Sequence, residues 1–99
     1  MNHNSLQELT NKYNWEIINN EISKTFVFND FNSAVAFFNL VAKEAEACNH
    51  HPDILNSFRK IKINLTTHDE KKITEKDLIL ASKIDALFNA FGIPIFSDV

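Results

Sequence analysis

Apolar and polar positions recur with two different periods along the chain, and these periods predict its helices and strands. Residues 30–49 carry apolar side chains at the three- and four-residue spacing of a helix with one buried face. That stripe consists of Phe31, Ala34, Val35, Phe38, Val41, Ala42 and Ala45. Asp30 is a suitable N-cap, and Pro52 prevents continuation of the helix. Phe37 and Leu40 widen the stripe, which fits either a subunit partner or a larger core.

A β-hairpin is predicted after this helix, from segments 53–58 and 61–66. The second segment alternates strictly between apolar and polar residues, as in a strand with one buried face. A turn at 59–60 places His51 opposite His68 when the same register is carried to the strand ends. Directly opposed residues have Cα atoms roughly 4.5–5.5 Å apart. Arg-Lys is not a favoured turn sequence, and an odd loop length would turn one strand over.

The first third of the chain predicts a short helix and another hairpin. Residues 5–13 begin with a serine and a glutamate spaced as in a capping box. Segments 15–21 and 22–29 alternate between apolar and polar positions, and Asn19 and Asn20 suit the positive φ of a tight turn.

The last helix is predicted to start at Thr74, where Asp77 completes a second capping box. Gly92 is placed to end this helix, and Pro94 to stop it. The order helix, two strands, helix, two strands, helix predicts an α+β fold over residues 1–99. We expect one domain, a four-stranded antiparallel sheet with helices packed on one face.

Composition narrows the class of protein. A length of 99 residues with 44% hydrophobic residues and nine phenylalanines is enough for one packed domain. The net charge of −3, with scattered Lys and Arg, argues against a direct nucleic-acid surface. One cysteine, Cys48, excludes an internal disulfide and fits a reducing compartment. The polar first fourteen residues and the lack of an apolar run of ~20 residues predict a cytoplasmic protein without a membrane span.

Histidine supplies the candidate chemistry, because three of the four histidines are expected to converge. They are His50, His51 and His68. An unperturbed imidazole has a pKa of about 6.5 and can exchange protons near neutrality. We expect His50 in the last helical turn, with Glu46 on the same face and able to orient its ring. Neighbouring histidines seldom share one ion, and no H-E-x-x-H pattern is present, so we expect no metal.

The spacing of these residues resembles the active-site signature of the pterin-4a-carbinolamine dehydratases. The residues that carry the resemblance are Glu46, His50, His51, Pro52, Phe58, His68 and Asp77. The segment from Phe26 to Phe31 is similar to the family's F-x-F-x-D-F entry to its second helix. The resemblance extends over residues 13–88 and implies dehydration of 4a-hydroxytetrahydrobiopterin to quinonoid dihydropterin, with no metal or organic cofactor. This reaction recycles the pterin cofactor of aromatic amino-acid hydroxylases.

The resemblance also assigns roles to residues. Three histidines face the pterin, three residues lie in segments that line it, and two acids support them. They are, in that order, His50, His51 and His68; Pro52, Thr67 and Asp69; and Glu46 and Asp77. Loss of water from C4a needs an acid at its hydroxyl and a base at N5, each contributing about 10²- to 10⁴-fold. A helix C-terminus favours a cationic His50, which suits the acid, whereas His51 or His68 would be the base.

Several alternatives stay open at this stage. Relatives of this fold also act as protein-binding modules, stabilising a transcription-factor dimer or assisting assembly of a carboxylase. A pterin-binding protein without turnover is a third reading. Ile54, Asn49 and Lys72 depart from the family pattern, which leaves the rate and the preferred pterin open. Retention of all three histidines favours the enzyme, and we expect a homodimer or homotetramer.

Overall fold

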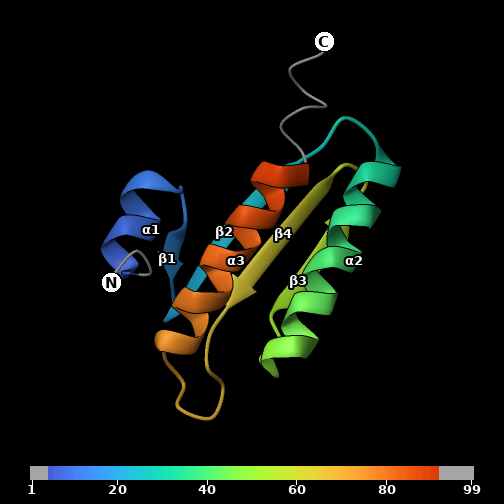
Figure 1. Cartoon of the computed structure of the whole chain (residues 1–99). Coiled ribbons are helices and arrows are strands. Elements are labelled where there is room, and N and C mark those ends of the chain that lie inside the picture. Colours follow the sequence, from blue (N-terminus) through green and yellow to red (C-terminus); the bar gives the residue numbers. More distant parts are fainter. Residues whose placement is uncertain (1–4, 92–99) are drawn as a thin grey trace.

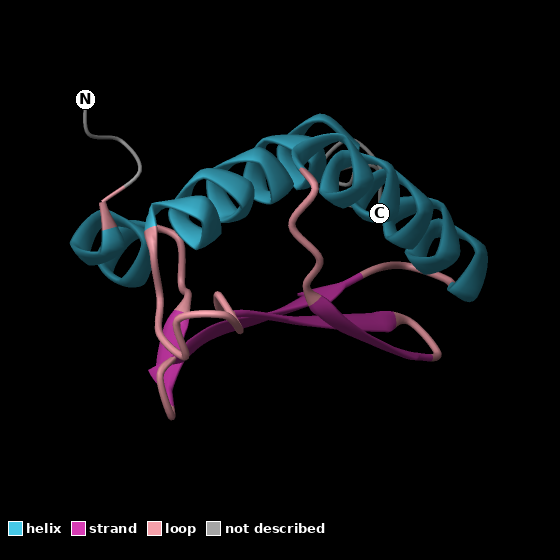
Figure 2. Cartoon of the chain, turned by 90° about the horizontal axis from the view of Figure 1, so that it is seen from below, coloured by secondary structure: helices cyan, strands magenta, loops and turns pink. Residues whose placement is uncertain are grey.

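The structure, a computed structural model, describes residues 5–91 and contains three helices and four strands there. The helices are α1 (Leu6–Lys12), α2 (Phe31–Cys48) and α3 (Glu75–Phe91), and the strands are β1 (Glu16–Ile18), β2 (Glu21–Val27), β3 (Asp53–Ser57) and β4 (Lys60–Leu65). The antiparallel sheet has the order β1-β2-β4-β3, with α2 and α3 side by side in front of it (Figure 1). All three helices lie on one side of the sheet, which confirms the predicted α+β fold (Figure 2).

The core lies between the helices and the inner face of the sheet. Ile61, Ile63 and Leu65 of β4 are fully buried, while the residues between them face the other side. Phe37 of α2 is also fully buried. Of the two alternatives for this residue, it therefore belongs to the core of the chain and does not face a subunit partner. Phe31, expected in the buried stripe, is instead 49% exposed, because the buried line of α2 runs through other positions. These positions are Ala34, Phe37, Val41 and Ala45.

The β3–β4 hairpin exists, but its predicted register is wrong by two residues. Ser57 pairs with Lys60, so the turn residues are 58 and 59, and Ile54 lies opposite Ile63 rather than Leu65. A shift of two keeps every side chain on its predicted face, since side chains alternate along a strand. Carried past the strand ends, this register no longer places His51 opposite the third histidine.

The turn itself is unusual because Phe58 adopts a positive φ of 55°. Glycine or asparagine normally occupies such a position. Here the Asn56 side-chain amide donates hydrogen bonds to the carbonyls of Phe58 and Lys60, at 3.2 and 3.3 Å. The Phe58 ring also stacks on Phe31, with centroids 6.5 Å apart. These contacts stabilise a turn that the sequence alone disfavours.

Asn49 determines where α2 ends. It adopts the left-handed conformation, with φ 53°, and its backbone N–H donates to the carbonyls of Ala45 and Glu46. The next N–H, of His50, also donates to the Ala45 carbonyl. His50 therefore lies beyond the helix and not in its last turn, which corrects the prediction. Asparagine is a common residue at such a helix end.

The predicted caps at the other helix starts are present. The Ser5 hydroxyl accepts from Glu8 N, and Asp30 Oδ1 accepts from Ser33 N at 2.7 Å. The predicted hairpin turn at Asn19 and Asn20 is also confirmed, because both residues have positive φ. The expected C-terminal signals of the last helix, Gly92 and Pro94, lie outside the described residues.

A buried polar contact attaches the N-terminal segment to α3. Asp85 is 6% exposed, and its Oδ2 accepts a hydrogen bond from Trp15 Nε1 at 2.9 Å. Its Oδ1 lies 2.6 Å from Lys24 Nζ of β2. One carboxylate thus joins β2, α3 and the segment before β1.

Candidate active site

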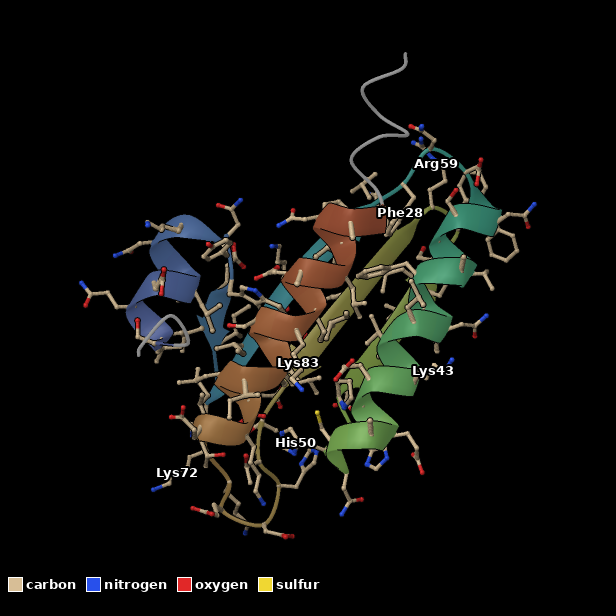
Figure 3. All side chains as sticks on the ribbon, viewed as in Figure 1. Phe28, Lys43, His50, Arg59, Lys72 and Lys83 are labelled. Carbon is tan, nitrogen blue, oxygen red and sulfur yellow. The ribbon has the colours of Figure 1, made fainter. Side chains whose placement is uncertain are left out.

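A pocket of about 290 Å³ at one end of the molecule brings the three histidines together. Its lining residues are Asn49, His50, His51, Thr67, His68, Asp69 and Lys76. They come from the segment after α2, the loop after β4 and the first turn of α3. Figure 3 shows His50 and Lys72 at this end, with Phe28 and Arg59 at the opposite end. The predicted convergence is therefore observed, although the ladder register expected to produce it is not.

The loop after β4 positions the third histidine. Thr67 forms an isolated bridge with Lys72, with a hydrogen bond of 3.0 Å from Thr67 N to the Lys72 carbonyl. The N–H groups of Glu70 and Lys71 both donate to the Thr67 carbonyl. This tight loop carries His68 and its neighbour on the surface, with His68 facing the pocket. The pairing that holds the loop is internal, so His68 does not depend on β3.

Asp77 is the buried centre of the site. It is 0% exposed, and its Oδ2 accepts hydrogen bonds from Thr67 Oγ1 and Thr74 N, each at 2.9 Å. Its Oδ1 lies 2.6 Å from His50 Nε2. Thr74 Oγ1 accepts in return from Lys76 N, at 3.3 Å. Asp77 therefore completes the predicted capping box of α3 and also holds a histidine of the pocket.

This contact fixes the chemistry available to His50. A carboxylate only accepts hydrogen bonds, so Nε2 of His50 carries the hydrogen that points to Asp77. The nitrogen left for a substrate is Nδ1. The His50 side chain is 12% exposed, so it reaches the pocket from a mostly buried position. A carboxylate behind an imidazole sets its tautomer and ring orientation, as required for directed proton transfer.

The second acid pairs with a different histidine from the one predicted. Glu46 Oε1 lies 3.0 Å from His51 Nε2, and both side chains are largely exposed. Because Asn49 turns the chain out of the helix, His50 is no longer on the face that Glu46 occupies. An exposed pair of this kind contributes little to stability, about 0–1 kcal/mol. The His68 side chain is exposed and has no hydrogen-bond or ion-pair partner among residues 5–91.

The other expected site residues divide into two groups. Thr67 and Asp69 line the pocket, but the Thr67 hydroxyl is already engaged by Asp77 and by Thr74 Oγ1, at 2.6 Å. Pro52 is half-buried and is not among the pocket's lining residues.

Sequence reasoning did not select two of the lining residues, Asn49 and Lys76. The available signal was their position, because each directly precedes a residue of the signature. Asn49 stands before the histidine pair, and Lys76 stands before Asp77.

A charged contact joins α2 and α3 near this end. Lys83 Nζ lies 3.3 Å from Glu44 Oε2, and the Cys48 thiol donates to the same oxygen at 3.8 Å. The hydrogen bond to Glu44 raises the pKa of the Lys83 ammonium group, and the Cys48 sulfur adds to this effect. Cys48 is partly buried against the core.

Within residues 5–91, no three His, Cys, Asp or Glu side chains are arranged to bind a metal ion. None of the helices in the same range is long and apolar enough to cross a membrane.

Comparison with known proteins shows which family this chain resembles. Residues 1–87 match the family described as Pterin 4 alpha carbinolamine dehydratase. A protein from Sulfurisphaera tokodaii, provisionally named a pterin-4-alpha-carbinolamine dehydratase, is 46% identical over 81 residues, 82% of this chain and 87% of that protein. A relative from Herpetosiphon aurantiacus with the same provisional name is 45% identical over 84 residues, 85% of this chain and 88% of that protein.

Solved structures agree with the fold. A Brucella melitensis protein described as a transcriptional coactivator/pterin dehydratase superposes with a TM-score of 0.73 at 29% identity, covering 84% of this chain and 95% of that one. A pterin dehydratase-like protein identified as a RuBisCO assembly factor of the alpha-carboxysome gives a TM-score of 0.62. At 23% identity, with 74% of this chain and 84% of that one covered, it supports the fold alone.

Proposed function

We propose that this chain, which belongs to the pterin-4a-carbinolamine dehydratase family, removes water from 4a-hydroxytetrahydrobiopterin to give quinonoid dihydropterin. The observation that carries the proposal is the pocket lined by His50, His51 and His68, with His50 held by the buried Asp77. The reaction needs an acid and a base on one small ring, and imidazoles can supply both near neutral pH.

The chemistry is an elimination across the C4a–N5 bond. The C4a–oxygen bond breaks as the hydroxyl takes a proton and leaves as water. The proton on N5 is removed, and its electron pair forms the C4a=N5 double bond. One proton enters and one leaves, so the product differs from the substrate by one water. Positioned groups contribute about 10²- to 10⁴-fold each to such transfers.

We assign the acid role to His50. Its protonated ring would be stabilised by the Asp77 carboxylate 2.6 Å from Nε2, leaving Nδ1–H to protonate the departing hydroxyl. His51 or His68 takes the N5 proton, since both rings are exposed at the pocket. Thr67 supports the acid indirectly, because its hydroxyl donates to the same carboxylate. Glu46 acts through His51, and Asp69 contributes an acceptor at the pocket wall.

The test is turnover of 4a-hydroxytetrahydrobiopterin, followed by absorbance of the quinonoid product. We expect the wild type to exceed the uncatalysed rate. Separate variants His50→Gln, His51→Gln and His68→Gln should each lose about tenfold or more. The control is His3→Gln, which alters the one histidine outside the signature and should keep wild-type activity. Circular dichroism confirms that each variant is folded. A wild-type rate equal to the uncatalysed rate would contradict the proposal.

Protein binding is the second candidate, favoured by the description of the Brucella melitensis structure as a coactivator as well as a pterin dehydratase. In that case the chain would act as a protein-binding module of the same fold. Absence of both turnover and dihydropterin binding would favour this candidate. Binding of a dihydropterin without acceleration would instead favour a pterin-binding protein that does no chemistry.

We also propose self-association as a homodimer or homotetramer. Strand β3 lies at an edge of the sheet, so the backbone groups on its outer side are available for pairing. Nearby Leu55, Phe58 and Phe31 are 62%, 67% and 49% exposed, a concentration of apolar surface that favours a partner copy. Sedimentation at micromolar concentration should give a multimer, and a monomer alone would contradict this proposal. A single cysteine in the sequence supports a cytoplasmic location.

A further inference from the structure

The size of the pocket limits how much of a pterin it can enclose. At about 290 Å³ it lies just below the ~300–1,000 Å³ found for ligand sites. A flat bicyclic ring fits such a volume and leaves little room for the substituent at C6. C6 is bonded to N5, the atom that loses a proton, so the substituent starts beside the histidines. It must then extend towards the mouth of the pocket.

Lys76 is the lysine that lines this pocket. It lines the pocket from the first turn of α3, one residue before Asp77, and it is exposed, whereas His50 is mostly buried. Its backbone N–H is used by Thr74 Oγ1. Its ammonium group has no ion-pair partner within residues 5–91, unlike those of Lys24 and Lys83. The ammonium group therefore remains available as a donor to a ligand.

We propose that Lys76 is a specificity-determining residue that donates a hydrogen bond to an oxygen of the pterin's C6 substituent. This inference rests on the proposed function for the nature of its ligand. The shared chemistry is an oxygen acceptor, either a side-chain hydroxyl or a phosphate ester. Asp69 lines the same pocket, and its carboxylate is an acceptor. A hydroxyl of the C6 substituent could therefore accept from Lys76 and donate to Asp69. A substituent without oxygen, such as methyl, satisfies neither residue.

The experiment compares three 4a-hydroxytetrahydropterins, which carry a methyl group, a dihydroxypropyl group or a phosphorylated polyol at C6. Wild-type kcat/KM for the oxygenated forms should exceed that for the methyl form by about three- to fivefold, the upper part of the range for an exposed charged contact. Lys76→Met should reduce this ratio to about one, through KM rather than kcat. Lys76→Arg should restore it. Lys43→Met, at an exposed lysine of α2 outside the pocket lining, is the matched control and should keep the wild-type ratio.

Further measurements separate the two sources of oxygen and the two proposals. If the kcat/KM ratio of the phosphorylated form to the methyl form is the larger one and decreases with added salt, the contact is due to charge. If the phosphorylated and dihydroxypropyl forms give equal ratios, the contact is a hydrogen bond to a hydroxyl. Equal wild-type kcat/KM for all three forms, or an unchanged ratio in Lys76→Met, would overturn the inference. Binding of the three non-reacting 7,8-dihydropterins gives the same ratio without turnover. A preserved binding ratio with no wild-type catalysis would overturn the dehydratase proposal alone, and no binding would overturn both.

Discussion

Replacing Asp77 by alanine would leave three donors inside the protein without their carboxylate acceptor. The donors are His50 Nε2, Thr67 Oγ1 and Thr74 N. Hydrogen bonds to a charged group contribute about 1.5–3 kcal/mol each. Two of the losses are partly offset, because Thr67 keeps its contact with Thr74 Oγ1 and the His50 side chain, 12% exposed, reaches water. We therefore expect the free energy of unfolding to fall by about 3–5 kcal/mol.

Asp77→Asn provides the milder test of the same reasoning. The amide keeps the side-chain volume and one acceptor oxygen, but its NH₂ group only donates, so the side chain can accept hydrogen bonds on one side of the site and not on both. We expect a loss of about 1–3 kcal/mol and a change in the ring-nitrogen chemical shifts of His50, because its tautomer is no longer fixed. Urea denaturation of both variants measures the stability, and nitrogen NMR measures the tautomer.

Glu46→Gln is the matched control, because it also removes a carboxylate that contacts a histidine. Glu46 is 82% exposed in its side chain, so we expect its unfolding free energy to change by less than about 0.5 kcal/mol. The reasoning is refuted if Asp77→Asn and Glu46→Gln change stability equally. It is also refuted if the His50 nitrogen shifts of Asp77→Asn match those of the wild type.

Two further predictions concern the fold. Lys24→Met should lower the unfolding free energy by about 3–5 kcal/mol, because Asp85 stays buried with Trp15 as its remaining donor; thermal denaturation measures this, and a change below about 1 kcal/mol would contradict it. Hydrogen bonds from Ser33 hold the pKa of Asp30 below its usual 3.8. The cap therefore stabilises the fold above that pKa and is lost as pH falls through the lower folded value. In Asp30→Asn the free energy of unfolding should depend less on pH between about pH 5 and pH 2 than in the wild type, as measured by denaturation at each pH. The same pH dependence in both proteins would contradict this prediction.

Features set by neighbouring residues were predictable from the sequence. The cap at Asp30 and the capping box of Thr74 and Asp77 each depend on side chains within three residues of the helix start. The turn at Asn19 and Asn20 depends on the tolerance of asparagine for positive φ. In these cases local chemistry and the final fold favour the same conformation.

Features that depend on distant contacts were not predictable in the same way. The turn at Phe58 has a positive φ, and its distant support comes from stacking on Phe31 of α2 and from the pairing of β4 with both neighbours. His50 pairs with Asp77, 27 residues away, rather than with Glu46. A left-handed Asn49 is a single backbone change, yet it moves His50 from one acid to the other.

The convergence of the histidines was expected from the wrong geometry. Strand pairing would have placed His51 opposite His68, but the paired strands end before either residue. Instead, Asn49 turns His50 towards Asp77 and leaves His51 exposed at the pocket, and the bridge between Thr67 and Lys72 holds the third histidine. The spacing of the signature residues still predicted the cluster. That prediction does not depend on which backbone conformation brings the three histidines together.

The dual use of the Asp77 carboxylate has a consequence for anyone who redesigns this protein. Oδ2 of Asp77 accepts from Thr74 N at the start of α3 and Oδ1 holds His50, so replacing this side chain alters the helix start and the histidine together. Screens for turnover and screens for heat resistance should converge on this codon. An engineered change in reactivity at His50 would need a new helix start built in the same step.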